Sequence, residues 1–311
     1  MQKQNNNEVS APVPGLVSVI LGAYDIAPLL HQTLDSVLAQ RHVQLEIIVV
    51  DDGSTDGTGA VLESYGDRIR AVTQANGGVA AARNTGLKHA RGEFIALMDH
   101  DDLCMPERLA VQMACLRALP QVSLCCSEFS GFSEEGPIAE AYSGHYYAKC
   151  DEANGGTAGH YSHRHVLDIG ACLSDGKAPH SSATTTVFWG EVYEDIACGN
   201  FVHPPTVMFR ASLLAQVGEF DPTAGLMCDW EWLVRAARYT PFASIDRPLL
   251  NYRRSAGQIS SPRYHRSALL DMLTVAEGIA RRDPSLWQRQ PEALKANLVD
   301  ITMDVADANA E

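Results

Sequence analysis

A chain of 311 residues, 46% of them hydrophobic and 20% charged, suffices for one large or two modest globular domains. Its 24 basic and 38 acidic residues give a net charge of -14, which argues against unassisted binding to nucleic acid or to an anionic membrane surface. No apolar run reaches the roughly 18 to 20 residues of a membrane span, and the Asn-rich start lacks the features of a signal peptide. We therefore expect a cytoplasmic protein without a membrane span, for which a peripheral membrane contact stays open.

The first part of the chain alternates short apolar runs with segments of helical periodicity. Segment 1–15 is polar and is expected to be a disordered tail. The runs expected as strands are 17–21, 45–50, 69–73, 94–98 and 122–127, and the expected helices are 28–40, 58–65, 79–90 and 106–119. This order predicts an α/β fold with a Rossmann-like, mixed but mainly parallel sheet that carries helices on both faces.

The rhythm breaks between residues 133 and 200, which we interpret as a long irregular insertion. It contains His160, His163 and His165 near Cys150, in a spacing that matches no familiar zinc site, so we expect solvated histidines. The eight cysteines of the chain form no CxxC pair and are expected to be free thiols. Regular segments resume at 205–209, 211–217, 229–239 and 248–253, and a helical extension covers 262–282 and 291–308.

Acidic residues follow two of the predicted strands. Asp99, Asp101 and Asp102 come directly after the run 94–98, and such carboxylates repel one another unless something positive lies among them. A hard cation, Mg²⁺ or Mn²⁺, is the usual partner, although one of these residues could instead cap the helix near Pro106. Because ligands of open α/β sheets bind at the carboxyl ends of strands, the loops 22–25, 51–57 and 99–102 should line one crevice.

The loop 51–57 imitates part of a calcium-binding EF-hand. It follows a β-branched run where that motif requires a helix, so we set calcium aside. A carboxylate at this strand end, that of Asp52, can instead accept a hydrogen bond from the N–H of a base.

Five segments together resemble family-2 glycosyltransferases of the GT-A fold. They are 17–20, 49–56, 77–86, 92–102 and 228–232, in the order and spacing of that family. The resemblance is strong over 16–128 and moderate over 200–260, and it implies a nucleotide-diphosphate-sugar donor, a UDP-sugar by default. It further implies a part that binds this donor at 16–128, a part that binds the acceptor at 129–260, and C-terminal helices at 261–311.

The resemblance also implies roles for single residues. Asp52 would contact the base, Asp99 would lie near the ribose and the metal, and Asp101 would coordinate the Mn²⁺ or Mg²⁺ that bridges the diphosphate. Ala23 and Tyr24 of the first loop would join this nucleotide site. Two further residues carry weaker expectations: His100 is expected to be a bystander, and Arg83 either contacts the diphosphate or pairs with an acid at the sheet edge.

Asp229 is the candidate catalytic base. An inverting transfer needs a carboxylate to remove the proton of the acceptor hydroxyl, and Asp229 fits the family's acidic pair, in which Cys228 replaces the other acid. The alternative is a plain helix cap. Arg235 could turn toward the site or lie on the exposed face. At least one of Trp230 and Trp232 is expected to pack in the core, and weaker candidates near the diphosphate are Arg253, Gln258 and Ser260.

These expectations describe a metal-dependent inverting glycosyltransferase acting on a carbohydrate or glycolipid acceptor in polysaccharide, glycolipid or glycoconjugate synthesis. A nucleotidyltransferase that makes sugar nucleotides is one alternative, but segment 22–25 lacks the Gly-rich, basic loop which that chemistry commonly places after the first strand. A non-catalytic module that binds sugar nucleotides is the other. The sequence leaves the donor sugar, the acceptor and the oligomeric state open.

Overall fold

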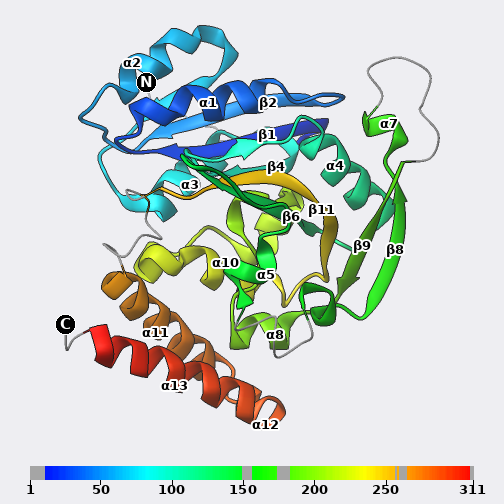
Figure 1. The fold of residues 1–311 in the computed structure, drawn as a ribbon, viewed down its shortest axis with the longest axis vertical. Coiled ribbons are helices and arrows are strands. Elements are labelled where there is room, and N and C mark those ends of the chain that lie inside the picture. Colours follow the sequence, from blue (N-terminus) through cyan, green and yellow to red (C-terminus); the bar gives the residue numbers. More distant parts are fainter. Residues whose placement is uncertain (1–10, 149–155, 174–182, 256–257, 259–264, 309–311) are drawn as a thin grey trace, which may run out of the picture.

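A computed structural model describes residues 11–148, 156–173, 183–255, 258 and 265–308. Within these residues, a mixed sheet of 11 strands runs in the order β3-β2-β1-β4-β10-β6-β11-β9-β8, and β5 and β7 pair with β11 and β6 at its margins (Figure 1). The strands are β1 (Val13–Ala23), β2 (Gln44–Asp51), β3 (Arg70–Thr73), β4 (Gly92–Met98), β5 (Leu103–Cys104), β6 (Leu124–Ser133), β7 (Gly136–Ala139), β8 (His163–Asp168), β9 (Thr184–Gly190), β10 (Met208–Arg210) and β11 (Phe242–Arg253).

Helices cover both faces of this sheet, as the sequence predicts. They are α1 (Ala27–Leu38), α2 (Thr58–Tyr65), α3 (Gly78–His89), α4 (Arg108–Ala118), α5 (Ser143–Tyr146), α7 (Gly170–Leu173), α8 (Tyr193–Cys198), α9 (Leu214–Val217), α10 (Cys228–Ala236), α11 (His265–Arg282), α12 (Leu286–Arg289) and α13 (Pro291–Ala308). The core that includes residues of α1, α2 and α4 takes one set of β1 residues, such as Val19, while the core of α10 takes Ile20 from the other face. The predicted fold class is therefore confirmed.

The strands β3, β2, β1 and β4 are parallel, and this makes their carboxyl ends meet. Ala23 at the end of β1 lies opposite Asp51 of β2, and Leu21 lies opposite Met98 of β4. The strands β1, β2 and β4 are largely buried, as strands covered by helices on both faces must be, whereas the edge strand β3 is largely exposed. The three loops that follow them consequently leave the sheet at one edge.

Beyond β4 the sheet becomes mixed. The short strand β10 runs antiparallel between β4 and β6, and β11 runs parallel to β6. One continuous sheet thus extends through segments 16–128 and 129–260, and their division into a donor part and an acceptor part stays a prediction.

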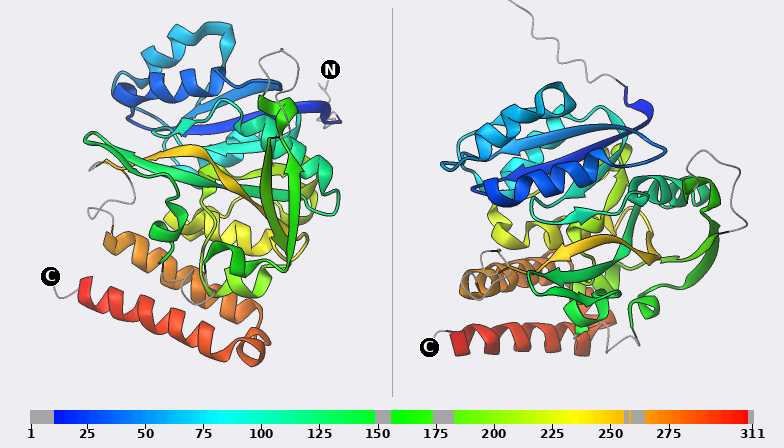
Figure 2. Two further views of the ribbon diagram at one scale, coloured as in Figure 1. Left: turned by 45° about the vertical axis from the view of Figure 1, so that its right-hand side comes forward. Right: turned by 45° about the horizontal axis from the view of Figure 1, so that its top comes forward.

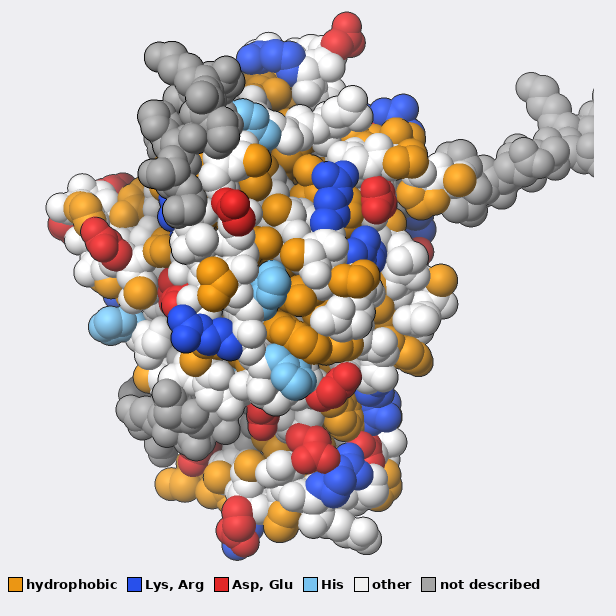
Figure 3. Space-filling view, turned by 90° about the vertical axis from the view of Figure 1, so that its right-hand side faces the viewer, with side chains coloured by type: hydrophobic (Ala, Val, Ile, Leu, Met, Phe, Trp, Pro, Cys, Tyr) orange, Lys and Arg blue, Asp and Glu red, His pale blue; other side chains and the backbone are white. Residues whose placement is uncertain are grey.

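The prediction of an irregular insertion at 133–200 is wrong in part, because this segment contributes β7, β8, β9 and three short helices. The strand β8 pairs with β9 at the margin of the sheet, where Val166 is 59% exposed. Polar His, Arg and Asp side chains therefore interrupt the apolar pattern by which a buried strand is recognised. Figure 3 shows this face, on which basic, acidic and hydrophobic side chains are interspersed.

Both ends of the chain differ slightly from the expectation. Residues 1–10 lie outside the described part, but Val13 already pairs with Gly92, so the predicted tail is too long at its end. The C-terminal helices α11 and α13 pack on each other below α10, where Ala276, Leu294 and Ile301 join the same buried core as α10 (Figure 2). Among the described helices, none is long and apolar enough to cross a membrane.

Candidate active site

Hydrogen bonds lock the three predicted loops together at the edge of the sheet. The carboxylate of Asp25, a residue with a positive φ of 46°, accepts the backbone N–H of Thr55 at 2.7 Å. The backbone N–H of Asp52 donates to the carbonyl of Ala23 at 2.9 Å. His100 Nδ1 lies 3.0 Å from the carbonyl oxygen of Gly22, so the expected bystander in fact ties the third loop to the first. The loops 22–25, 51–57 and 99–102 thus lie together, as expected.

Asp52 is buried and holds the turn that opens α3. Its Oδ1 accepts hydrogen bonds from Gln74 Nε2 at 2.6 Å and the Gly77 N–H at 3.0 Å, and its Oδ2 accepts the Gly78 N–H at 2.8 Å. Gly78 has a φ of 82°, which suits glycine. The structure therefore gives Asp52 a backbone-anchoring role, and its contact with a base stays a prediction.

The first loop offers the site one exposed side chain. Tyr24 is 46% exposed, whereas the Ala23 side chain is buried and the carbonyl of Ala23 is already bonded to the Asp52 N–H. A contact of Ala23 or Tyr24 with the nucleotide stays a prediction.

Arg83 joins two acids that come from distant parts of the chain. Its side chain, only 5% exposed, projects from α3, and its Nη2 lies 3.1 Å from Asp99 Oδ1. Its Nη1 forms an ion pair with Asp229 Oδ1. The guanidinium also lies 5.6 Å from the ring centroid of Phe220. Of the two alternatives left open for Arg83, the pairing with acids at the sheet edge is the one present here.

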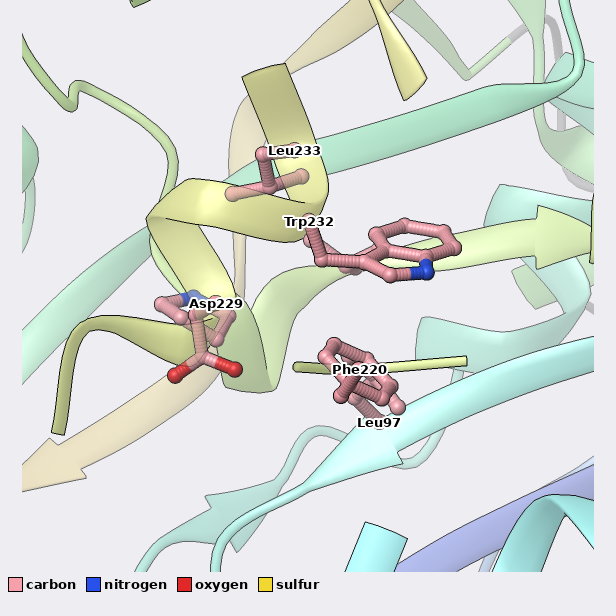
Figure 4. Close-up of a pocket in the computed structure, with 7 residues that line it drawn as sticks. Leu97, Phe220, Asp229, Trp232 and Leu233 are labelled. Carbon is pink, nitrogen blue, oxygen red and sulfur yellow. The ribbon is translucent and has the colours of Figure 1, made fainter. Parts of the chain in front are cut away.

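Asp229 lies in the first turn of α10, and its side chain is 17% exposed. The N-cap of this helix is Met227, so Asp229 is not the cap residue. It borders a narrow crevice whose other walls are Leu97, Pro204, Val207, Phe220, Trp232 and Leu233. Figure 4 shows its carboxylate at the start of the helix, with Trp232 and Leu233 projecting one turn later.

Both tryptophans of α10 belong to the core. Trp230 is 2% exposed and donates its indole N–H to the Ile196 carbonyl at 2.7 Å; Trp232 is fully buried and donates to the Gly218 carbonyl at 2.9 Å. Arg235 neither turns toward the site nor lies free on the surface. It pairs with Glu231 and donates to the carbonyl of Glu219 at 2.8 Å, which fixes the preceding loop on the helix.

The acids after β4 differ sharply in their surroundings. The Asp99 side chain is 40% exposed, whereas Asp102 is 1% exposed and its Oδ2 has no hydrogen-bond partner among the described residues. Burial raises the pKa of Asp101, and the charge of Asp99 adds to this effect. Burial likewise raises the pKa of Asp102 well above its usual range, with the charges of Asp101 and Asp99 adding to it.

These oxygen donors suit a hard divalent cation. In the described part of the chain, no group of three His, Cys, Asp or Glu side chains is arranged to hold a metal ion. Asp99 and Asp101 would therefore supply only part of a coordination shell, as is usual for Mg²⁺, which takes one or two carboxylates together with substrate phosphates.

Strand β11 closes the site from the other side. Arg253 donates its backbone N–H to Asp102 Oδ1 at 2.8 Å and its Nε–H to the carbonyl of Asp101 at 2.7 Å. Gln258 Nε2 donates to the hydroxyl of Tyr252, and Ser260 lies outside the described residues. Arg253 thus buttresses the acidic loop, although its side chain belongs to a segment 151 residues later.

The histidines near residue 160 serve separate purposes. His160 is 4% exposed and stacks on Phe201 at a centroid distance of 3.8 Å, so its expected solvation is wrong. His163 is exposed and stacks on Trp189 at 4.3 Å. Cys150 lies outside the described residues, and the seven cysteines within them are free thiols, as expected.

Sequence patterns missed an aromatic group beside the site. It comprises Phe129, Tyr142, Tyr146, His203 and Tyr252, whose rings contact one another. These residues come from β6, from α5 and the residue that precedes it, from β11 and from the segment before β10, and no local motif connects them.

Comparison with known proteins supports the assignment suggested by the motifs. The sequence model of the family described as Glycosyl transferase family 2 matches residues 18–167. An uncharacterized glycosyltransferase of Rickettsia typhi, RT0329, is 41% identical over 104 residues, 33% of each chain. A putative teichuronic acid biosynthesis glycosyltransferase of Bacillus subtilis, TuaG, is 38% identical over 122 residues, 38% of this chain and 47% of TuaG. The chain thus spans less than half the length of either relative.

Two solved structures share the fold over most of the chain. The mannosyltransferase PcManGT from Pyrobaculum calidifontis, in complex with GDP-Man and Mn²⁺, aligns with a TM-score of 0.59 at 19% identity, covering 94% of this chain and 75% of that one. S. aureus TarS 1-349 in complex with UDP aligns with a TM-score of 0.53 at 19% identity, covering 86% and 72%. The match over residues 18–167, just under half of the chain, together with the motifs, shows that this segment is similar to glycosyltransferase family 2, and the chain shares a GT-A-like fold with these two structures.

Proposed function

We propose that the chain is a metal-dependent inverting glycosyltransferase that moves a sugar from a nucleotide-diphosphate donor to an acceptor hydroxyl in polysaccharide or glycoconjugate synthesis. The observation that carries the proposal is the shared guanidinium of Arg83. It brings the carboxylate after β4, where a cation and diphosphate would lie, next to the carboxylate of Asp229. The proposed transfer uses a general base for the acceptor hydroxyl and a cation for the departing diphosphate, and both have to lie within reach of one donor sugar.

The proposed step divides the work among these residues. The bond between the sugar carbon and the donor phosphate breaks, a bond to the acceptor oxygen forms, and Asp229 takes the acceptor's proton. A divalent cation held by Asp99 and Asp101 would stabilise the charge on the departing nucleoside diphosphate. Arg83 keeps the base at a fixed place beside the donor and adds a positive charge to that end of the site.

The test is release of nucleoside diphosphate from a panel of UDP-, GDP- and dTDP-sugars in the presence of Mn²⁺. We expect one class of donor to be turned over and Asp101→Ala to reduce turnover by at least about a hundredfold while the protein stays folded. Asp246→Ala is the matched control, because Asp246 is an exposed acid on β11. Near-normal turnover by Asp101→Ala would refute the proposed metal site.

A second variant addresses the base. Asp229→Asn should still bind the donor but should transfer at a rate lowered by about 10² to 10⁴, the usual contribution of a general base. An unchanged kcat would remove Asp229 from this role. Formation of pyrophosphate from a nucleoside triphosphate and a sugar phosphate would instead favour the nucleotidyltransferase, and donor binding without turnover would favour the non-catalytic module.

A further inference from the structure

The aromatic group missed by the sequence surrounds one buried imidazole. His203 stacks on Phe129 at a centroid distance of 4.3 Å and meets the ring of Tyr252 edge-on at 4.9 Å. Tyr146 also meets the imidazole edge-on, with a centroid distance of 5.2 Å, and is 38% exposed. Of these three rings, Tyr146 is the most exposed to solvent.

Hydrogen bonds define which nitrogen of His203 is free. The Tyr147 hydroxyl lies 3.2 Å from the Val202 carbonyl, to which it donates, and 3.3 Å from His203 Nδ1. Because this hydroxyl gives its proton to the carbonyl, it accepts from Nδ1–H, which leaves Nε2 with a lone pair. Nε2 is buried and has no hydrogen-bond partner among the described residues. Burial lowers the pKa of His203 to about 4, so the ring is neutral at neutral pH.

The imidazole lies next to the reacting groups proposed above. Pro204, the following residue, lines the crevice that Asp229 borders. Tyr252 precedes Arg253, which donates to the acidic loop at Asp101 and Asp102. His203 and Tyr252 of the aromatic group are thus each followed directly by a residue that contacts the proposed active site.

The outer part of the group is rigidly supported. Glu128 Oε1 accepts the backbone N–H groups of Phe129 at 2.7 Å and Ser143 at 3.0 Å, which anchors the short helix α5 on β6. A Cβ on Gly131 would come within 2.9 Å of the Tyr142 ring, so this glycine permits the close packing. Aromatic side chains around one unpaired polar atom are the kind of lining that small-molecule sites use.

We propose that this aromatic group is the acceptor subsite, in which a neutral pyranose stacks on Tyr146 and donates one hydroxyl to His203 Nε2. The proposal rests on the proposed function, because it assigns the second substrate of that transfer. Entry requires Tyr146 to turn away from His203. Glu128, which accepts the backbone N–H of Phe129, and Asp99, whose charge acts on His203, disfavour an anionic ring at this place, so we expect a neutral carbohydrate.

The test measures binding of defined sugars by saturation-transfer NMR. Methyl β-glucopyranoside, methyl β-galactopyranoside and N-acetylglucosamine serve as probes, and UDP and GDP are titrated in parallel in the presence of Mn²⁺. We expect at least one sugar to bind. His203→Phe, which keeps the stacking ring but removes Nε2, and Tyr146→Ala should each raise its dissociation constant about tenfold, the effect of one lost hydrogen bond or stacking contact. Tyr239→Ala, at a tyrosine 54% exposed elsewhere, is the matched control.

Three outcomes would overturn the assignment. One is that none of the sugars binds the wild-type chain, and another is that both variants bind sugar as the control does. The third is that the variants weaken nucleotide and sugar equally, which would place His203 at the donor instead. Tyr146→Ala changes a partly exposed residue and so still decides the matter if His203→Phe fails to fold. Because sugar binding is measured without turnover, failure of the acceptor site and failure of the proposed activity give different results.

Discussion

The two sides of the site hold their polar groups in different ways. At the ends of β1 and β2, single acids bind loops about 30 residues away, as Asp25 does with Thr55. Around β6 and β11 the partners are far more distant, such as Ser130 with Leu250, 120 residues apart, or Arg253 with Asp101, 152 apart. The first arrangement depends on loops that follow neighbouring strands. The second depends on which distant segments of the chain pair in the sheet.

Arg83 stands where these two regions meet, so its removal should have the largest effect. Arg83→Met leaves the mostly buried Asp229 carboxylate without its partner, and we expect a loss of about 3 to 5 kcal/mol in the free energy of unfolding. Chemical denaturation measures this loss. The exposed Arg91, whose side chain is 62% exposed and pairs with Glu46, is the control, and Arg91→Met should cost about 1 kcal/mol or less.

Equal losses in these two variants would contradict the idea that Arg83 fastens the two regions together. A loss confined to Arg83→Met would instead show that the ion pair between α3 and α10 contributes to folding as well as to the site.

The same contrast explains what the sequence could and could not predict. Apart from the two-residue strand β5, the strands and helices up to α4 lie close to where apolar periodicity predicts them. Asp52 and Asp99 could be singled out because each follows a strand, and Asp229 because it begins a helix, in a recognisable pattern. The role of Arg83 stayed open, since its sequence neighbourhood does not reveal which acid lies 16 or 146 positions later.

The aromatic group escaped prediction for a related reason. Phe129, Tyr142 and Tyr252 have no common periodicity, and the contact of Phe129 with Tyr252 depends on the parallel pairing of β6 and β11. The strand β8 was missed because its marginal position removes the need for an apolar pattern. Strand pairing between distant segments, and not local propensity, therefore determines both the aromatic group and strand β8.

In the region around β6 and β11, we expect the free energy of unfolding to depend on pH through His203. This effect should be smaller than that of replacing Arg83. The pKa of His203 is lowered from 6.5 to about 4 by burial, so the unfolded chain binds this proton more tightly than the folded chain. Stability is therefore full above pH 6.5 and falls as the pH drops toward 4, by about 3 kcal/mol for this group. Denaturation of wild type and His203→Phe at several pH values measures the difference in slope. Identical slopes in both proteins between pH 6.5 and 4 would exclude a buried neutral His203.

The smallest expected effect lies at the C-terminal helices, where a polar cluster is closer to solvent. Asp283 accepts hydrogen bonds from Ser285 Oγ at 2.5 Å, Tyr193 at 2.9 Å and Arg289 at 3.0 Å. The Asp283 side chain is 12% exposed, but its partner Arg289 is 40% exposed, whereas Arg83 is 5% exposed. The Ser285 hydrogen bond, together with Tyr193 and Arg289, lowers the pKa of Asp283. Its contribution is therefore present above the unfolded pKa of 3.8 and is lost as the pH falls further.

Replacement of Asp283 measures how much this cluster contributes to the stability of the C-terminal helices. Asp283→Asn keeps one acceptor oxygen but removes the charge, so thermal or chemical denaturation at pH 7 should show a loss of about 1 kcal/mol. The variant should also lose less stability than wild type below pH 3.8. A loss as large as that of Arg83→Met would mean that α11 and α12 are held as tightly as the two regions of the site. The expected difference between the buried ion pairs of Arg83 and the more exposed cluster around Asp283 would then be refuted.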